Sequence, residues 1–140
     1  IECNTDIVTI CYAGVIRYSE LKYAYETMMA VLETGPVYCV VDITEVMFTR
    51  ASVETIEQTG DDFSFAEHPN LLGMFYVLPD ALSHPRTESL YAYCERKGVL
   101  HRAYLCETIN EALCTISNVD HNDPFSCTGS SIRLSDLQWA

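Results

Sequence analysis

The sequence contains few cations and few glycines. It has 8 Lys and Arg against 20 Asp and Glu, a formal net charge of −12 over 140 residues. A surface of that sign repels phosphate backbones and anionic lipids, so nucleic acids and membrane surfaces are poor partners. With 6 glycines and neither a Gly-x-Gly-x-x-Gly pattern nor a Walker loop, the chain also lacks the usual phosphate cradles.

Other absences narrow the function classes further. No apolar run approaches the roughly 20 residues that span a bilayer, and residues 1–6 have no signal-peptide character. No Gly-x-Ser-x-Gly elbow is present for a serine nucleophile. These absences favour a non-catalytic protein that does not cross a membrane.

The cysteines number seven, and none falls in a Cys-x-x-Cys pair. Cys11 and Cys39 lie in predicted strands, whereas Cys94 and Cys114 lie in predicted helices. All four positions suit small buried hydrophobes better than disulfides. We therefore expect a reducing environment and a cytoplasmic location.

Hydrophobic residues make up 49% of the chain, enough for the core of a single domain. β-branched and aromatic runs alternate with segments of helical periodicity. This order predicts an α/β fold with a mixed, largely parallel central sheet and helices packed against it. The predicted strands are 7–13, 37–43, 71–78 and 102–106, and the predicted helices are 19–34, 49–60, 85–98 and 108–116.

Three local signals predict where helices begin. Ser19 suits an N-cap, and Pro85 suits the first position of a helix. Thr108 and Glu111 fit a capping box, in which Thr108 bonds forward and Glu111 bonds back.

The pattern of strands and helices stops after residue 116. Residues 1–116 are predicted to form the domain, and residues 117–140 a C-terminal tail that is extended or docks elsewhere. The tail is rich in turn-forming residues, and its large apolar residues stand singly, as in short docking segments. They are Ile132, Leu134, Leu137 and Trp139.

One strand-to-helix segment carries a family resemblance. Val40-Val41-Asp42-Ile43-Thr44 is followed by Val46-Met47-Phe48 and a polar turn that opens a helix, and Cys106-Glu107-Thr108-Ile109-Asn110-Glu111-Ala112-Leu113 ends the pattern. Over residues 7–116 the chain resembles the STAS superfamily, SpoIIAA-like branch. The resemblance implies a sheet packed on helices and binding of a protein partner. We expect no cofactor, because the chain lacks the motifs that hold one.

The resemblance also implies a regulatory serine. In anti-sigma-factor antagonists of the superfamily, a serine in an Asp-Ser-Ser-Gly pattern at the start of this helix is phosphorylated. In this chain Arg50-Ala51-Ser52-Val53 occupies that place, and only the serine matches. Ser52 is thus the candidate phosphoacceptor, and a phosphate there would have Arg50 nearby. The alternative is that Ser52 or Thr49 is an ordinary N-cap.

An acidic segment marks the candidate partner-binding surface. No Lys or Arg occurs between Arg50 and Arg86. The candidate contacts are Thr49, Arg50, Glu54, Glu57 and, in the tail, Trp139. They predict a protein partner with a basic face, although a solvated acidic surface has the same composition.

Other functions are less well supported by the residues. Two sets of acidic and histidine residues, at 61–68 and 120–123, lack the spacing of a metal site, so we expect no metal. Cys106 and His101 would point to opposite faces of a strand, which argues against a catalytic dyad. Alternatives that stay open are an apolar-ligand carrier lined by Met28, Met29, Met47 and Phe48, an accessory subunit docking through its tail, and a homo-oligomer.

Overall fold

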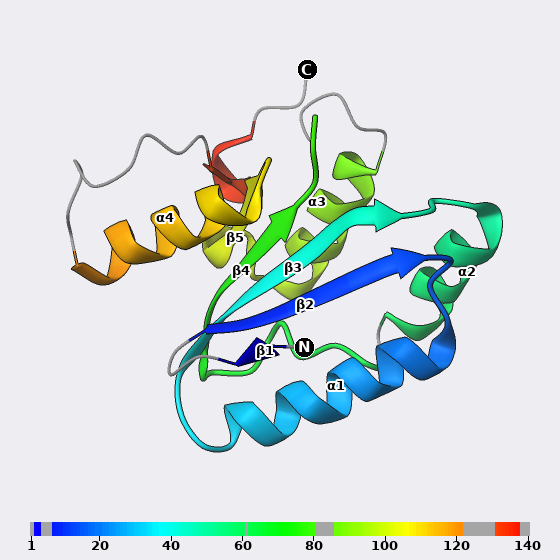
Figure 1. Cartoon of the computed structure of the whole chain (residues 1–140), viewed down its shortest axis with the longest axis horizontal. Coiled ribbons are helices and arrows are strands. Elements are labelled where there is room, and N and C mark those ends of the chain that lie inside the picture. The colour runs from blue at the N-terminus through cyan, green and yellow to red at the C-terminus, as the bar shows by residue number, and fades with distance from the viewer. Residues whose placement is uncertain (1, 4–6, 61, 81–85, 122–130, 138–140) are drawn as a thin grey trace.

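The protein is described by a computed structural model that covers residues 2–3, 7–60, 62–80, 86–121 and 131–137 (Figure 1). Strands and helices alternate through most of the chain. In chain order the elements are β1 (Glu2–Cys3), β2 (Ile7–Gly14), α1 (Tyr18–Leu32), β3 (Val37–Val46), α2 (Arg50–Thr59), β4 (Leu71–Val77), α3 (Thr87–Lys97), η1 (Leu100–Arg102), β5 (Ala103–Cys106), α4 (Ile109–His121), β6 (Ile132–Arg133) and η2 (Leu134–Asp136).

The strands form one sheet of six, in the order β1-β2-β3-β4-β5-β6. The four strands β2 to β5 run parallel, and the two-residue strands β1 and β6 pair antiparallel at the two edges. The predicted α/β class with a mixed, largely parallel sheet is therefore confirmed. Within the described residues, no helix is long and apolar enough to cross a membrane.

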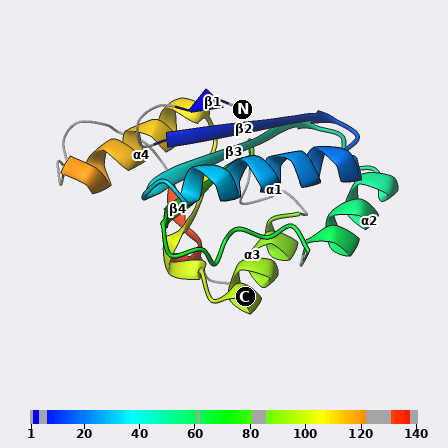
Figure 2. The ribbon, with the colours of Figure 1, turned by 90° about the horizontal axis from the view of Figure 1, so that it is seen from below.

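Helices cover both faces of the sheet, but unequally. Helices α1, α2 and α3 lie on one side and α4 on the other (Figure 2). The larger core joins Met28 of α1 and Cys94 of α3 to strand residues such as Val8 and Cys39. The smaller core forms beneath α4. Burial on both faces explains why residues 37–41 and 73–78 are apolar without alternation.

Two of the predicted caps differ in the structure. Helix α1 begins one residue before Ser19, with Arg17 at the N-cap and no side-chain hydrogen bond there. Ser19 therefore lies inside the first turn and is not the cap. Thr108 does accept a bond from the Glu111 amide at 3.1 Å, but Glu111 receives its bond from the Glu107 amide at 2.9 Å instead of from Thr108. The predicted start of α3 at Pro85 lies outside the described residues, which place Thr87 in its first turn.

The segment after residue 116 belongs partly to the domain. Helix α4 continues to His121, and β6 pairs with β5 through Leu105 opposite Ile132. Leu134 is fully buried in the larger core, and Leu137 packs against the same core. The structure therefore places residues 131–137 inside the domain instead of in a separate tail.

The cysteines also depart from the prediction at two positions. Cys39, Cys94 and Cys106 are buried and form no disulfide, as small hydrophobes would, but Cys11 is exposed. Cys114 is disulfide-bonded, to a cysteine outside the described side chains. The prediction that Cys114 is a buried hydrophobe and not a disulfide is therefore wrong.

Candidate functional site

The candidate site lies where β2 and β3 end and α2 begins. Loops at the carboxyl ends of parallel strands are where α/β proteins usually bind their ligands. Strand β2 ends at Gly14 and β3 at Val46, and the two ends are joined by a hydrogen bond from the Met47 amide to the Gly14 carbonyl at 2.8 Å. Helix α2 starts directly afterwards, at the same end of the molecule (Figure 1).

Two hydroxyl groups fix the start of α2. Thr49 is the N-cap, and its side chain accepts a hydrogen bond from the Ser52 amide at 3.2 Å. Ser52 is fully buried, and its Oγ accepts a bond from the Ile16 amide at 3.0 Å. The Thr49 hydroxyl lies 3.5 Å from the same Oγ. These contacts tie α2 to the loop between β2 and α1, so the two loops form one unit.

The burial of Ser52 bears directly on its predicted phosphorylation. A kinase needs an accessible hydroxyl, and this one is enclosed and hydrogen-bonded. To be modified, Ser52 would have to leave the cap and release the Ile16 amide. Phosphorylation of Ser52 stays a prediction, and in the conformation described here the residue has a structural role. Thr49 likewise acts as the cap, which is the alternative that the sequence left open.

The outer face of α2 is charged and exposed. Arg50 Nε lies 2.9 Å from Glu54 Oε1, and the Arg50 side chain is 93% exposed. Because Arg50 is engaged one turn along the helix, it does not approach the Ser52 hydroxyl in this structure. Glu57, on the same exposed face, adds a further negative charge. An exposed ion pair of this kind contributes little stability, so these side chains are available for contacts with a partner.

Exposed apolar side chains accompany these charges. Met47 is 56% exposed, Val15 38% and Ile56 36%. The Met47 amide donates a hydrogen bond to the carbonyl of Gly14, the residue before Val15, and this bond places Met47 beside Val15. Sequence reasoning did not single out Val15 and Ile56 as surface residues, because β-branched residues in a helix or after a strand usually mark the core.

Met47 lies apart from the other residues that were predicted to line a carrier pocket. Met28 is fully buried in the larger core between α1 and the sheet, whereas Met47 lies on the surface at the carboxyl end of β3. Met29 and Phe48 are partly buried around that core. Three of the four residues therefore belong to one core and Met47 does not, and the carrier hypothesis stays a prediction.

The Cys106 thiol lies in an environment that disfavours its ionised form. Cys106 is buried at the end of β5, where burial raises the pKa of its thiol to about 11. The Ser131 hydroxyl donates to Cys106 Sγ at 3.1 Å, and His101 lies in η1, outside the strand. A thiol with this pKa is protonated near neutral pH and is a poor nucleophile. The prediction that Cys106 and His101 do not form a dyad stays a prediction.

Metal-binding groups can be searched only where side chains are described. Within those parts of the chain, no group of three or more His, Cys, Asp or Glu side chains could hold a metal ion. Asp61 and Asp123, from the two sets considered in the sequence, lie outside the described residues, as does Trp139.

The chain matches no protein-family model, no curated protein and no solved structure.

Proposed function

We propose that the chain is a non-catalytic regulatory or adaptor domain of STAS or SpoIIAA-like type, which binds a protein partner through the outer face of α2. One observation carries the proposal. Polar contacts of Thr49 and Ser52 hold the start of α2 from the inside, the outside presents Glu54 and Glu57, and the partly exposed side chain of Ile56 lies at the border between the two faces.

This combination suits a partner with a basic and partly apolar face. The charge of the whole chain, −12, attracts such a partner over a distance and repels nucleic acids and anionic membranes. The exposed apolar side chains supply contact area once the partner has docked. The rigid anchoring of α2 keeps the cost of ordering the surface low.

The test exchanges charge on α2 without touching its anchors. We expect Glu54→Lys/Glu57→Lys to weaken binding at least about tenfold, because the partner would meet like charges. The matched control is Glu26→Lys/Glu33→Lys, which makes the same change in net charge at exposed positions of α1 and beyond its end. Co-purification of the tagged 140-residue chain and both variants from native lysate, with quantitative mass spectrometry of everything eluted, compares the three directly.

The outcomes separate specific docking from general charge attraction. A stoichiometric protein that is retained by the control and lost by the α2 variant supports the proposal. A partner that survives the α2 exchange, or one that both variants lose equally, contradicts it. If the chain elutes without a partner protein but with the added mass of a small molecule, the result would instead support the apolar-ligand carrier hypothesis.

A cytoplasmic location is the final part of the proposal. Cys11, Cys39, Cys94 and Cys106 form no disulfide, which supports a reducing compartment, whereas the disulfide at Cys114 weighs against it. Alkylation of intact cells before lysis, followed by mass analysis of the chain, shows whether Cys114 is oxidised in its native compartment. An oxidised Cys114 in all molecules would contradict the cytoplasmic location.

A further inference from the structure

Helix α2 differs from the other helices in what it buries. Helices α1, α3 and α4 each place side chains in one of the two cores, for example Met28, Cys94 and Ile116. Among the described residues of those cores, none comes from residues 50–59 of α2. Most helices of globular proteins are held by the burial of an apolar face, because short helices are marginal by themselves. Helix α2 is therefore attached more weakly than the other three.

The side of α2 that faces the domain consists mainly of hydroxyl groups. Its buried residues are Ser52 and Thr59, which lie seven positions apart and therefore on one side of the helix. Thr55 lies on the same side and is half-buried. The apolar residues Val53 and Ile56 are both partly exposed, Ile56 to 36%. A face of this composition removes little apolar surface from water, so the hydrophobic effect contributes little to its attachment.

Two of these three hydroxyl groups bond within the helix itself. Thr55 donates to the Ala51 carbonyl at 2.9 Å, and Thr59 donates to the Thr55 carbonyl at 2.6 Å. Bonds of this kind satisfy the hydroxyl without joining the helix to a neighbour. The Ser52 hydroxyl accepts the bond from the Ile16 amide, which we call the latch. Among the side-chain hydrogen bonds of the described residues, the latch is the one that joins α2 to another part of the fold.

The sequence of α2 also does little to stabilise a helix on its own. Half of its ten residues are Ser, Thr, Val or Ile, which form helices less readily than Ala, Leu or Glu. Its first turn has no acidic residue and its last turn no basic one, so no side chain there complements the macrodipole. At the other end, Gly60 is right-handed and does not adopt the left-handed conformation that closes many helices. Without the latch, α2 therefore has little to keep it folded.

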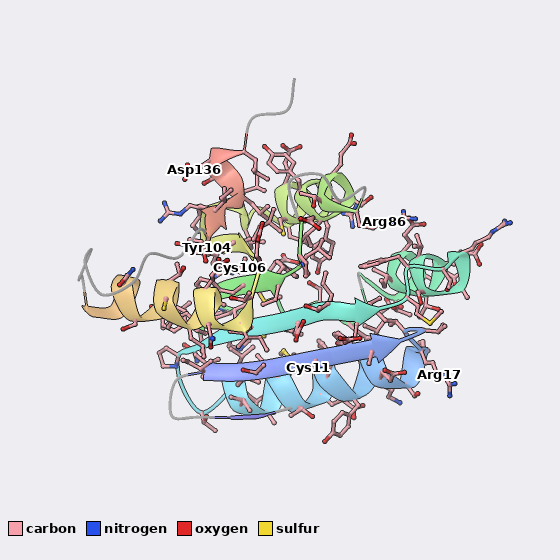
Figure 3. The ribbon with its side chains drawn as sticks, turned by 45° about the horizontal axis from the view of Figure 1, so that its top comes forward. Cys11, Arg17, Arg86, Tyr104, Cys106 and Asp136 are labelled. Carbon is pink, nitrogen blue, oxygen red and sulfur yellow. The ribbon has the colours of Figure 1, made fainter. Side chains whose placement is uncertain are left out.

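Aromatic residues hold the chain in place on both sides of α2. Phe48, which precedes the helix, packs against the larger core. Phe63, which follows it, contacts the rings of Tyr18 and Tyr25 at centroid distances of 5.1 and 5.7 Å. The helix between these two points lies at the margin of the molecule, beyond the carboxyl ends of β2 and β3 (Figures 1 and 3). The segment can therefore leave the domain without displacing the elements on either side.

We propose that α2 opens as a unit. In the opening the latch breaks, residues 50–59 leave the domain and lose their helical structure, and the sheet and the other three helices stay folded. Proteins open locally at free energies that range from near zero to that of global unfolding, and elements with few buried apolar contacts open most readily. The closed state is the dominant one, because in it the Ser52 hydroxyl and the Ile16 amide satisfy each other in a buried place.

The opening regulates the partner site on α2, and this step rests on the function proposed above. The partner is expected to contact Glu54 and Glu57 as the folded helix presents them. An opened segment does not present them in that arrangement, so the partner binds the closed state. The apparent affinity is then reduced in proportion to the fraction of molecules that are closed. The latch between Ser52 and Ile16 therefore sets how much of the protein is ready to bind.

The experiment is amide hydrogen exchange, followed by NMR on the 140-residue chain alone. The helical hydrogen bonds of α2 begin with the Val53 amide, which donates to the Thr49 carbonyl at 3.0 Å. We expect the amides of residues 53–59 to share one protection factor, at least about 100-fold below that of the slowest amides in β3 and β4. Low concentrations of urea should accelerate those slowest amides strongly and residues 53–59 weakly, because the local opening exposes little surface.

Two variants separate the local opening from global unfolding. Ser52→Ala removes the latch and should accelerate the exchange of residues 53–59 at least about tenfold. Ile116→Val weakens the smaller core beneath α4, away from α2. It should accelerate the slowest amides of the sheet several-fold and leave residues 53–59 unchanged. Circular dichroism of each variant checks that it is folded.

Three outcomes would overturn the proposal. Residues 53–59 could be protected as strongly as the central strands, which would mean that α2 does not open separately. Protection that falls gradually toward one end of the helix would show fraying instead of opening as a unit. Equal acceleration of α2 and the sheet in Ile116→Val would show that α2 opens together with the whole domain. Because the chain is measured without a partner, none of these outcomes affects the test by Glu54→Lys/Glu57→Lys, and failure of that test would leave the opening intact.

Discussion

The buried contact between Ser52 and Ile16 makes the sharpest prediction about stability. Substituting Ser52→Ala removes the hydroxyl that accepts the bond of the Ile16 amide, in a place where both residues are buried. A buried amide left without a partner costs about 1–3 kcal/mol. The methyl group of alanine fits the space of the serine side chain, so we expect no large cavity penalty. The free energy of unfolding should fall by about 2 kcal/mol.

Ser19 provides a control with the same chemical change. It lies in the first turn of α1, is exposed and makes no cap bond there. If Ser19 were the N-cap that the sequence suggested, Ser19→Ala would cost about 1 kcal/mol. The structure instead predicts a change within about 0.5 kcal/mol, as is typical of surface positions. Together, Ser52→Ala and Ser19→Ala test the buried hydrogen bond to the Ile16 amide and the start of α1 at Tyr18.

Urea denaturation followed by far-UV circular dichroism measures both variants. With a slope of about 2 kcal/mol/M, the Ser52→Ala midpoint should fall by about 1 M and the slope should stay unchanged. A Ser52→Ala midpoint that coincides with that of Ser19→Ala would refute the reasoning, because the Ile16 amide would then need no protein acceptor.

Two further predictions concern the core. Leu134→Ala should lower the free energy of unfolding by about 2–5 kcal/mol, because Leu134 is fully buried in the larger core. A loss below about 1 kcal/mol would mean that residues 131–137 do not unfold together with the rest of the domain. Burial raises the pKa of Cys94 and of Cys106 from 9.0 to about 11, so the unfolded chain loses these protons first. The two buried thiols therefore contribute fully to the free energy of unfolding below pH 9. This contribution is lost as the pH rises toward 11, at up to about 1.4 kcal/mol per pH unit for each thiol. Urea midpoints at pH 8 and pH 10 measure this loss, and Cys94→Ala/Cys106→Ala should flatten the dependence; an unchanged dependence would show that these thiols do not cause it.

The main architecture could be predicted because its signals are local. Continuous apolar runs around 37–43 and 71–78 indicate strands buried on both faces, and the helical segments between them require crossovers. Both strands occur, as β3 and β4, and they pair in parallel. Every step of that inference uses residues a few positions apart, which is the range over which periodicity carries information.

Strand β6 could not be predicted because its signal is not local. It has two residues, and what defines it is the pairing of Ile132 with Leu105 of β5. The sequence around it is rich in turn-forming residues, and isolated apolar residues suit a docking segment as well as a packed one. Burial of Leu134 decides between these interpretations, and it depends on where the sheet and α3 lie in space.

At the candidate site, the role of Ser52 could not be predicted either, because it depends on a residue far away in the sequence. From local sequence it is a helix-start serine, available either as a cap or as a phosphoacceptor. Its hydrogen-bond donor is the Ile16 amide, 36 residues earlier, and no local pattern reveals that partner. The bond joins the loop between β2 and α1 to the first turn of α2. Because one buried hydroxyl anchors both loops, loss of that hydroxyl should loosen the start of the helix that we propose binds the partner.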